Sequence, residues 1–195
     1  MQVEKKDIHK SAKPTVIRNI QELRSALSQY RKVDQTIALV PTMGALHAGH
    51  MELVYRAKSL ADKIVVSIFV NPRQFSPSDD LDKYPRTETA DLKALKEAGV
   101  DIVFIPNVGE VYAEGFATAV HVAGPSRGLE SETRPEFFTG VATVVCKLLM
   151  QCLPDFAVFG DKDYQQLQVV RRMVRDLDIP SQIVSVPTVR EPDGV

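Results

Sequence analysis

Apolar runs of strand length recur along the chain. They are rich in Val, Ile and Phe and mostly lack alternating polar positions, which indicates strands covered on both faces. The pattern predicts five such strands, at Thr36–Val40, Lys63–Val70, Asp101–Ile105, Phe156–Phe159 and Gln182–Val186. A further strand is predicted at Thr118–Val122, inside the segment Val108–Glu132, whose pattern is the least readable.

Segments with helical spacing lie between the strands. One apolar stripe consists of Leu53, Val54, Ala57, Leu60 and Ala61, and another of Val141, Val144, Val145, Leu148 and Cys152. A third helix is predicted at Asp91–Ala98, because Gly99 follows it as a C-terminal cap. Strands that alternate with helices predict an α/β fold with a doubly wound, Rossmann-like parallel sheet, formed as one domain over residues 1–195.

Composition and charge exclude several classes of protein. The chain has 195 residues, of which 44% are hydrophobic and 25% charged, as is usual for a globular domain. The longest apolar stretch, Ile64–Val70, is interrupted by Ser67 and is too short to cross a bilayer. With a net charge of −1 and no run of Lys or Arg, the sequence does not indicate a basic surface that would bind nucleic acid or an anionic membrane.

The N-terminal residues and the two cysteines bear on the compartment. Residues 1–14 are polar and lack the apolar segment of a secretory signal. Cys146 and Cys152 fall in one predicted helix. Their spacing separates them by about 9 Å of axial rise, so no disulfide is expected between them. These features predict a reduced, cytoplasmic protein.

Candidate chemistry follows the first predicted strand. That strand continues into Pro41-Thr42-Met43-Gly44-Ala45-Leu46-His47-Ala48-Gly49-His50, where a helix begins. In open α/β sheets the ligand crevice lies at the carboxyl ends of the strands. Gly44 and Gly49 allow the backbone to approach a bound group, and the free N–H groups of the helix favour an anion. His47 and His50 are three positions apart, so both rings can face the same ligand.

The two histidines also have simpler explanations, as incidental surface groups or as metal ligands. A zinc site would need a third ligand, and no Cys or further His stands nearby in the sequence. The order of strand, Gly-rich turn and helix favours a nucleotide site, in which imidazoles donate hydrogen bonds to phosphate oxygens. The His-x-Gly-His (HxGH) arrangement resembles the signature of the nucleotidyltransferase superfamily, whose members displace pyrophosphate at the α-phosphate of a nucleotide.

Further motifs narrow the resemblance. They are Val70–Phe75, Asp80–Thr87, Arg134-Pro135, Gly140–Val145 and Phe159–Gln166. In this order and spacing they resemble the pantothenate synthetase (pantoate–β-alanine ligase) family over Thr15–Gly194. The resemblance implies an ATP- and Mg²⁺-dependent ligase that converts pantoate to pantoyl adenylate with release of pyrophosphate. β-Alanine then attacks the adenylate, releasing AMP and pantothenate. A homodimer is also expected.

The resemblance assigns roles residue by residue. His50 is the expected proton donor, with His47 and Lys162 as further catalytic residues. The ATP site is expected to contain Pro41, Thr42, Met43, Gly44, His47, Gly49, His50, Phe159, Gly160, Asp161, Lys162, Asp163 and Val189. The pantoate site is expected to contain Met43, Gln74, Gln166, Val141 and Val144.

The residue types suit these roles, although each has an ordinary alternative. Lys162 can neutralise phosphate charge or be a surface lysine, and Gln74 can hold pantoate or be a solvated loop residue. Asp163 is expected to cap the next helix and to orient the ribose. Gln165 and Gln166 point about 100° apart on a helix, so at most one faces the site. Val141, Val144 and Val145 are core residues or an apolar wall, and Asp79-Asp80-Leu81-Asp82 is a solvated loop or a metal site.

Three departures from the family pattern affect these expectations. Phe137 stands where the family usually has a histidine, and Ala90-Asp91 stands where some members have an acidic pair near Mg²⁺, which leaves Asp91 as the metal candidate. In the family, a Ser-Ser-Arg-Asn signature and a C-terminal lid domain follow the segment that ends here at Gly194, and this sequence contains neither. We therefore expect an N-terminal domain that binds ATP and pantoate but turns over poorly. The rival functions are a nucleotidylyltransferase acting on a phosphorylated alcohol and a nucleotide-binding module without turnover.

Overall fold

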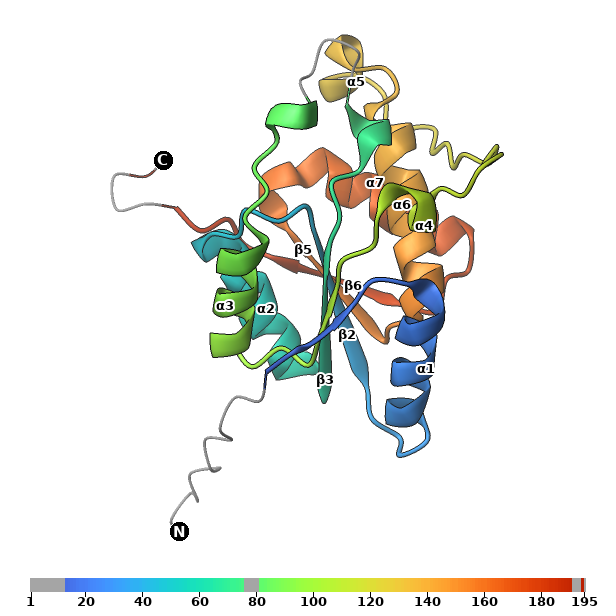
Figure 1. The fold of residues 1–195 in the computed structure, drawn as a ribbon. Helices are drawn as coiled ribbons and strands as arrows, with labels where there is room; N and C mark the ends of the chain where they lie inside the picture. Colours follow the sequence, from blue (N-terminus) through green and yellow to red (C-terminus); the bar gives the residue numbers. More distant parts are fainter. Residues whose placement is uncertain (1–12, 76–80, 191–193, 195) are drawn as a thin grey trace.

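A parallel β-sheet forms the centre of the protein (Figure 1). The computed structural model describes residues 13–75, 81–190 and 194. Within them the sheet has six strands in the order β1-β4-β3-β2-β5-β6, and all neighbours run parallel. The strands are β1 (Thr15–Ile17), β2 (Ile37–Thr42), β3 (Lys63–Ile68), β4 (Ile102–Phe104), β5 (Phe156–Gly160) and β6 (Gln182–Val186).

The strand order contains the reversal of a doubly wound fold. From β2 the chain adds β3 and β4 on one side, and then crosses to add β5 and β6 on the other. The switch point therefore lies between β2 and β5, where such sheets open a ligand crevice at the carboxyl ends of their strands. The predicted Rossmann-like sheet is confirmed.

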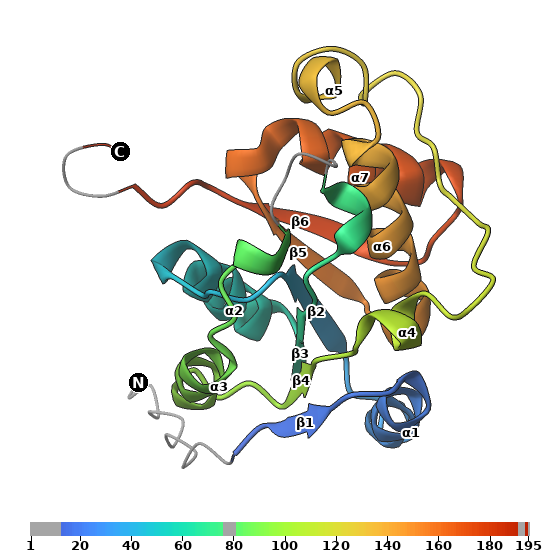
Figure 2. The same ribbon diagram turned by 45° about the horizontal axis from the view of Figure 1, so that its top comes forward.

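Helices cover both faces of the sheet (Figure 2). One face packs against α2 (Ala48–Leu60) and α3 (Glu88–Glu97), and the other against α1 (Ile20–Arg31), α6 (Phe137–Cys152) and α7 (Tyr164–Asp176). Alternate strand residues serve the two faces, since Leu39 belongs to the core under α6 and Val40 to the core under α2. This two-sided burial explains why the strands read as continuous apolar runs. The short helices α4 (Val108–Val111) and α5 (Glu130–Thr133) lie in the long connection before α6.

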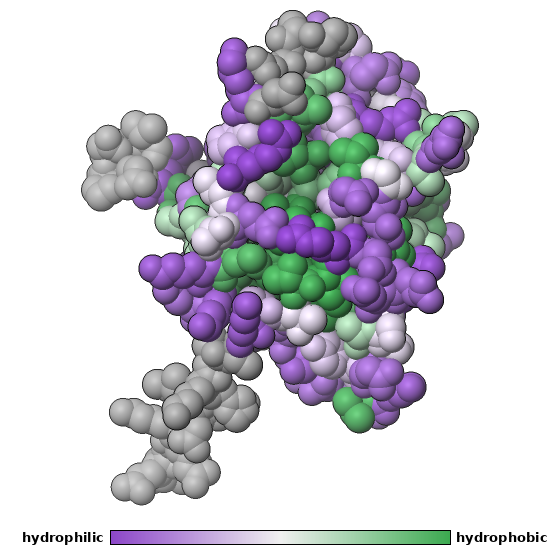
Figure 3. Space-filling model, in the orientation of Figure 1, coloured by the Kyte–Doolittle hydropathy of each residue, from purple (hydrophilic) through white to green (hydrophobic). Residues whose placement is uncertain are grey.

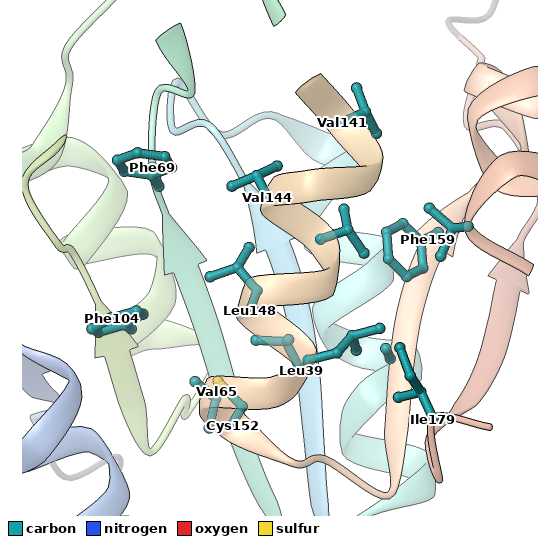
Figure 4. Packing of buried hydrophobic residues seen from close by; sticks show 14 of the residues in the cluster. Leu39, Val65, Phe69, Phe104, Val141, Val144, Leu148, Cys152, Phe159 and Ile179 are labelled. Atoms are coloured by element: carbon teal, nitrogen blue, oxygen red, sulfur yellow. The ribbon is translucent and has the colours of Figure 1, made fainter. Parts of the chain in front are cut away.

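Helix α6 joins the core to the switch point. Figure 4 shows Val144 and Leu148 on the same side of the helix, the side towards Phe69. Further along the helix Cys152 lies fully buried near Val65 in the filled core. The predicted apolar stripe is confirmed, and it continues from the core to the end of the sheet where the strands terminate.

Two further predictions are confirmed, one on the pairing of the cysteines and one on the glycine that ends α3. Cys146 and Cys152 are both free thiols. Gly99 follows α3 with a φ of +73°, and its N–H donates to the carbonyl of Lys96 at 3.0 Å. A residue with a Cβ would be strained in this backbone conformation, so glycine ends the helix here.

Two segments differ from the sequence expectation. Thr118–Val122 is not a strand: it has no ladder partner among the described residues, and Val120 N–H instead donates to the hydroxyl of Thr143 at 2.9 Å. The prediction there is wrong because β-forming residues need a sheet edge as well as a local preference. Strand β1 is too short for its three residues to register as a pattern, and it forms by pairing with β4 at the sheet edge.

The face seen in Figure 3 carries hydrophobic residues near its middle with hydrophilic residues around them. A shallow groove beside β1 has this composition, since Pro14, Val16 and Leu92 lie there among Lys13, Lys93 and Lys96. None of the helices in the described part of the chain is long and apolar enough to span a membrane.

Candidate active site

A cavity of ≈ 380 Å³ opens at the switch point between β2 and β5. Pro41, Thr42 and Met43 at the end of β2 form one side, and Phe159 and Gly160 at the end of β5 form another. Apolar side chains of α6 close the inner wall, as the cluster around Val141 and Val144 in Figure 4 illustrates. Its volume suits a small-molecule site.

The turn after β2 is built to bring α2 close to the cavity. The Thr42 hydroxyl donates to the carbonyl of Ser67 at 2.7 Å, which ties the end of β2 to β3. Gly44 and Ala45 then adopt left-handed backbone, with φ of +84° and +51°. A Cβ on Gly44 would lie 3.1 Å from Ile68 Cγ2 and 3.2 Å from Asp91 Oδ2, so this close turn favours glycine.

His47 and His50 cap the first turn of α2. His47 Nδ1 accepts from the N–H of Gly49 at 3.1 Å, and His50 Nδ1 accepts from the N–H of His47 at 3.4 Å. A backbone N–H can only donate, so the proton of each neutral ring stands on Nε2. Both side chains line the cavity, with ring centroids 4.1 Å apart. The pair therefore offers two N–H donors beside a helix N-terminus, which is an arrangement suited to phosphate oxygens.

His50 is neutral at physiological pH. Burial, followed by the neighbouring His47, lowers its pKa from 6.5 to about 4, although Asp91 and Asp163 act in the opposite direction. The capping hydrogen bond also favours the neutral ring, because protonation of Nδ1 would remove the acceptor for the N–H of His47. His50 can therefore donate a hydrogen bond from Nε2 without carrying a charge.

This pKa shift predicts a pH-dependent stability. The unfolded chain binds the His50 proton near pH 6.5, whereas the folded chain binds it only near pH 4. The group leaves stability unchanged above pH 6.5, and the free energy of unfolding should fall as the pH drops from 6.5 towards 4. Urea unfolding across this range should show a shallower decline for His50→Gln than for the original chain. Equal slopes would contradict a buried neutral imidazole.

A hydrogen-bond network at the cavity wall orients Gln74. Asn71 is buried; its Oδ1 accepts from the N–H of Arg73 at 3.3 Å, and its Nδ2 donates to the carbonyl of Gly140 at 3.2 Å. These backbone groups fix which end of the amide is the donor. Asn71 Nδ2 also donates to Gln74 Oε1 at 3.0 Å, and Tyr112 donates to Asn71 Oδ1 at 2.8 Å. Gln74 consequently turns its Nε2 donor towards Met43 Sδ, 3.1 Å away in the cavity wall.

This network depends on a close approach at Gly140. A Cβ there would overlap the carbonyl oxygen of Arg73 and lie 2.9 Å from the N of Gln74. We expect Gly140→Ala to lower the free energy of unfolding by about 1–3 kcal/mol, because α6 must move away from backbone that cannot yield easily. Urea unfolding of the variant and of the original chain measures this loss. Gly109→Ala is the control, since its Cβ would meet Asn107 Oδ1 at an ordinary 3.4 Å; an equal loss in both variants would contradict the packing argument.

The opposite side of the cavity carries charge. Lys162 and Asp163 follow β5 and line the cavity, and their side chains are 73% and 63% exposed. They form a loose ion pair at 3.8 Å, so the Lys162 ammonium is available to a ligand. Asp163 occupies the position before α7, but its side chain makes no capping hydrogen bond. The expectation of a capping carboxylate is therefore wrong.

The adjacent glutamines Gln165 and Gln166 separate as predicted. Gln166 lines the cavity. Gln165 points elsewhere, with Nε2 3.1 Å from both the Pro125 and Gly128 carbonyl oxygens, and it holds the segment before α5.

Most of the predicted site residues line one cavity. Gly44, Asp161 and Asp91 are not among the lining residues, and Asp91 instead accepts hydrogen bonds from the backbone of the turn after β2. Val145, for which the sequence left a core position and an apolar wall open, lines the cavity. The cavity also contains residues that were not predicted, namely Leu53, Phe69, Asn71, Tyr84, Leu148, Pro187 and Thr188. Asn71 could have been identified as a site residue from the sequence, since it directly follows the second predicted strand and belongs to the motif Val70–Phe75. Leu148 extends the spacing of Val141 and Val144.

The metal candidates and Phe137 have other surroundings. Both oxygens of Asp91 accept hydrogen bonds from protein groups. Among the described residues, no group of three or more His, Cys, Asp or Glu is arranged to hold a metal ion. Asp79 and Asp80 lie outside the described residues, and so does the side chain of Asp82. Phe137 packs under the guanidinium of Arg134, 4.3 Å from its ring centroid.

Comparisons with known proteins identify a family that this chain resembles over most of its length. Residues 15–195 match the family model described as pantoate-beta-alanine ligase. The chain is 56% identical over 180 residues to a pantothenate synthetase of Paramagnetospirillum magneticum, and 53% identical over 184 residues to one of Mesorhizobium japonicum. These alignments cover 92% and 94% of this chain but 63% and 65% of the relatives, so the chain spans about two thirds of their length.

Solved structures show the same likeness. Pantothenate synthetase from Thermus thermophilus superposes with a TM-score of 0.88 at 51% identity, over 92% of this chain and 64% of that one. A pantoate-beta-alanine ligase from Francisella tularensis, complexed with beta-gamma ATP and beta-alanine, gives a TM-score of 0.89 at 38% identity, over 93% of this chain and 70% of that one. The chain therefore belongs to the pantoate–β-alanine ligase family.

Proposed function

We propose that this chain binds ATP and pantoate for the ATP-dependent condensation of pantoate with β-alanine to pantothenate. The observation that carries the proposal is one cavity with three kinds of group: the Nε2 donors of His47 and His50, the ammonium of Lys162, and the amide of Gln74. Family membership supports it, and so does the relative solved with beta-gamma ATP and beta-alanine.

The reaction has two balanced steps. A carboxylate oxygen of pantoate attacks the α-phosphorus of ATP, and the bond to the bridging oxygen breaks, so that pyrophosphate leaves and pantoyl adenylate forms. The amine of β-alanine then attacks the acyl carbon, loses a proton, and expels AMP. In the first step negative charge builds on the leaving pyrophosphate, which is where hydrogen-bond donors and a cation lower the barrier.

The groups of this chain divide that work. His47 and His50 donate from Nε2 to phosphate oxygens at the start of α2, and Lys162 adds positive charge from the other side. Gln74 presents an N–H donor to the pantoate oxygens. A neutral amide holds the carboxylate in place without the strong ion pair that would weaken it as a nucleophile. Holding both reactants together accounts for up to about 7–11 kcal/mol of the barrier.

A nucleotidylyltransferase is the second candidate. It would need cationic side chains for the phosphate of its alcohol substrate as well as for ATP. Among the described residues that line the cavity, Lys162 is the single Lys or Arg, and the other polar lining groups are an acid, Asp163, two imidazoles, and neutral side chains such as Gln166. This composition favours pantoate over a phosphorylated alcohol.

Three further parts of the proposal come from the family resemblance. Mg²⁺ is proposed to accompany the ATP phosphates, because this ion binds substrate phosphates readily and keeps several waters. A homodimer is proposed as the assembly. The cytoplasm is proposed as the compartment, which agrees with the free thiols of Cys146 and Cys152.

Pantoate-dependent exchange of pyrophosphate into ATP tests the function. We would run it on this chain and on a chimera that continues into the remaining C-terminal third of the Paramagnetospirillum magneticum relative. Exchange in the chimera that disappears without pantoate would support adenylate formation, and exchange in this chain too would assign the first step to it. ATP binding with no exchange in either protein would reject the ligase and favour a nucleotide-binding module or a nucleotidylyltransferase.

A further inference from the structure

The turn before His47 is an unfavourable conformation that needs external support. Gly44 and Ala45 are both left-handed, and Ala45 carries a Cβ that disfavours a φ of +51°. The next residues, Leu46 and His47, lead directly into α2, so the direction of this turn sets the position of the two imidazoles. A turn of this kind persists only where neighbouring groups hold it.

Asp91 supplies that support from a different element. It lies in the first turn of α3 and is 3% exposed. Its Oδ1 accepts from the N–H of Leu46 at 2.9 Å, and its Oδ2 accepts from the N–H of Ala45 at 3.1 Å. One buried carboxylate thus holds two consecutive amides of the turn, and hydrogen bonds to a charged acceptor are the stronger kind.

Two neighbouring residues are adapted to this carboxylate. Thr87 stands at the N-terminal cap position of α3, yet its side chain makes no capping bond to the helix backbone, and its hydroxyl donates instead to the side chain of Asp91 at Oδ2, 3.1 Å away. The Cβ that any other residue would add at Gly44 would lie 3.2 Å from the same oxygen, so glycine leaves room for the carboxylate. Both oxygens of Asp91 are therefore occupied by protein donors.

We propose that Asp91 is a positioning residue for the ATP site, which holds the Gly44–Leu46 turn so that His47 and His50 face the phosphates. The inference rests on the function proposed above. It differs from the role that the family resemblance gives this position, because a carboxylate with both oxygens engaged by N–H and O–H donors does not suit direct coordination of Mg²⁺. Asp91 acts on the reaction through the turn.

The test compares Asp91→Asn and Asp91→Ala with Asp155→Asn. Asparagine keeps the shape of Asp91 but offers one acceptor oxygen in place of two, whereas alanine removes both. Asp155 is the matched control, since its carboxylate accepts from the backbone N–H of Ile37 at 2.7 Å, at the start of β2 and away from the cavity. Asparagine at Asp91 guards against a failure of the alanine variant to fold, which circular dichroism would reveal.

Three readouts separate the possible roles. Amide hydrogen exchange of Ala45 and Leu46, followed by NMR, reports the turn without any activity. The KM for ATP and for pantoate, together with the exchange rate, reports the site. The Mg²⁺ concentration that gives half-maximal exchange reports metal binding. The kinetic readouts use the chimera, and the NMR readout uses this chain.

The expected result is a loss of amide protection at Ala45 and Leu46 in both Asp91 variants. The exchange rate should fall about 10-fold in Asp91→Asn and about 100-fold in Asp91→Ala, since misplacing a catalytic group by about 1 Å has effects of this size. The KM for ATP should rise while the KM for pantoate and the Mg²⁺ midpoint stay constant. Asp155→Asn should change none of these values.

Other outcomes overturn the inference. Unchanged protection of the two amides would show that Asp91 does not hold the turn, whatever the enzyme does. A shifted Mg²⁺ midpoint with normal protection would make Asp91 a metal ligand. A chimera with intact Asp91 that shows no pantoate-dependent exchange would count against the proposed function, and the NMR result would still decide the role of Asp91 in the turn.

Discussion

Replacing His50 with alanine is expected to slow formation of the pantoyl adenylate by about 10²–10³-fold, the usual effect of removing one donor that stabilises a developing anion. His50 lines the cavity, and its Nδ1 is engaged by the N–H of His47, which leaves Nε2–H for the ligand. Its pKa of about 4 keeps the ring neutral, so the loss is that of a directed hydrogen bond rather than of a charge. Single-turnover measurements of adenylate formation with the chimera would give the rate.

A second substitution at the same position separates catalysis from helix capping. Glutamine at this position of a capping box can accept from the N–H of the cap residue, as His50 Nδ1 does. His50→Gln should therefore recover most of the melting temperature lost in His50→Ala, while its rate stays at least about tenfold low. His121→Ala is the matched control, because His121 is exposed and does not line the cavity. A loss under threefold in His50→Ala would rule out the assigned role.

The parts of the site that could be predicted are those encoded by neighbouring residues. The strand Thr36–Val40 is read from its own apolar run, and the turn and histidines that follow it sit at the carboxyl end of that strand by continuity of the chain. Gln165 and Gln166 differ by one helical step, so the geometry of the helix alone predicts that they diverge. Local periodicity and the usual winding of α/β sheets then bring the ends of β2 and β5 together.

The parts that could not be predicted depend on contacts between distant segments. The amide of Gln74 is oriented by Asn71, and Asn71 is in turn held by the carbonyl of Gly140, 69 positions after Asn71 in the chain. The carboxylate of Asp91 reaches amides 45 and 46 positions earlier. No periodicity of the sequence signals such pairings, because they exist only after α6 and α3 have packed. The resemblance to a family indicated Asp91 as a metal candidate, whereas its hydrogen bonds indicate a support for the turn.

Lys162→Ala is expected to reduce the rate of adenylate formation by about 10²–10³-fold, comparable with the loss of His50. The two residues face the same cavity but offer different interactions, a neutral donor from His50 and a positive charge from Lys162. Because the Lys162 side chain is largely exposed and only loosely paired with Asp163, it contributes little to the stability of the chain without ligand. The melting temperature of Lys162→Ala should therefore stay close to that of the original chain.

A conservative change and a matched control test whether the charge of Lys162 is what matters. Lys162→Arg keeps the charge and should recover part of the rate. Lys162→Gln keeps a polar N–H donor on a side chain one atom shorter, without the charge, and should resemble alanine. Lys93→Ala removes an exposed lysine on α3 that does not line the cavity, and it should leave the rate unchanged. Equal rates for the glutamine and arginine variants would show that Lys162 acts as a hydrogen-bond donor. A loss under threefold in Lys162→Ala would remove it from the site, leaving the two histidines and the N-terminus of α2 to hold the phosphates.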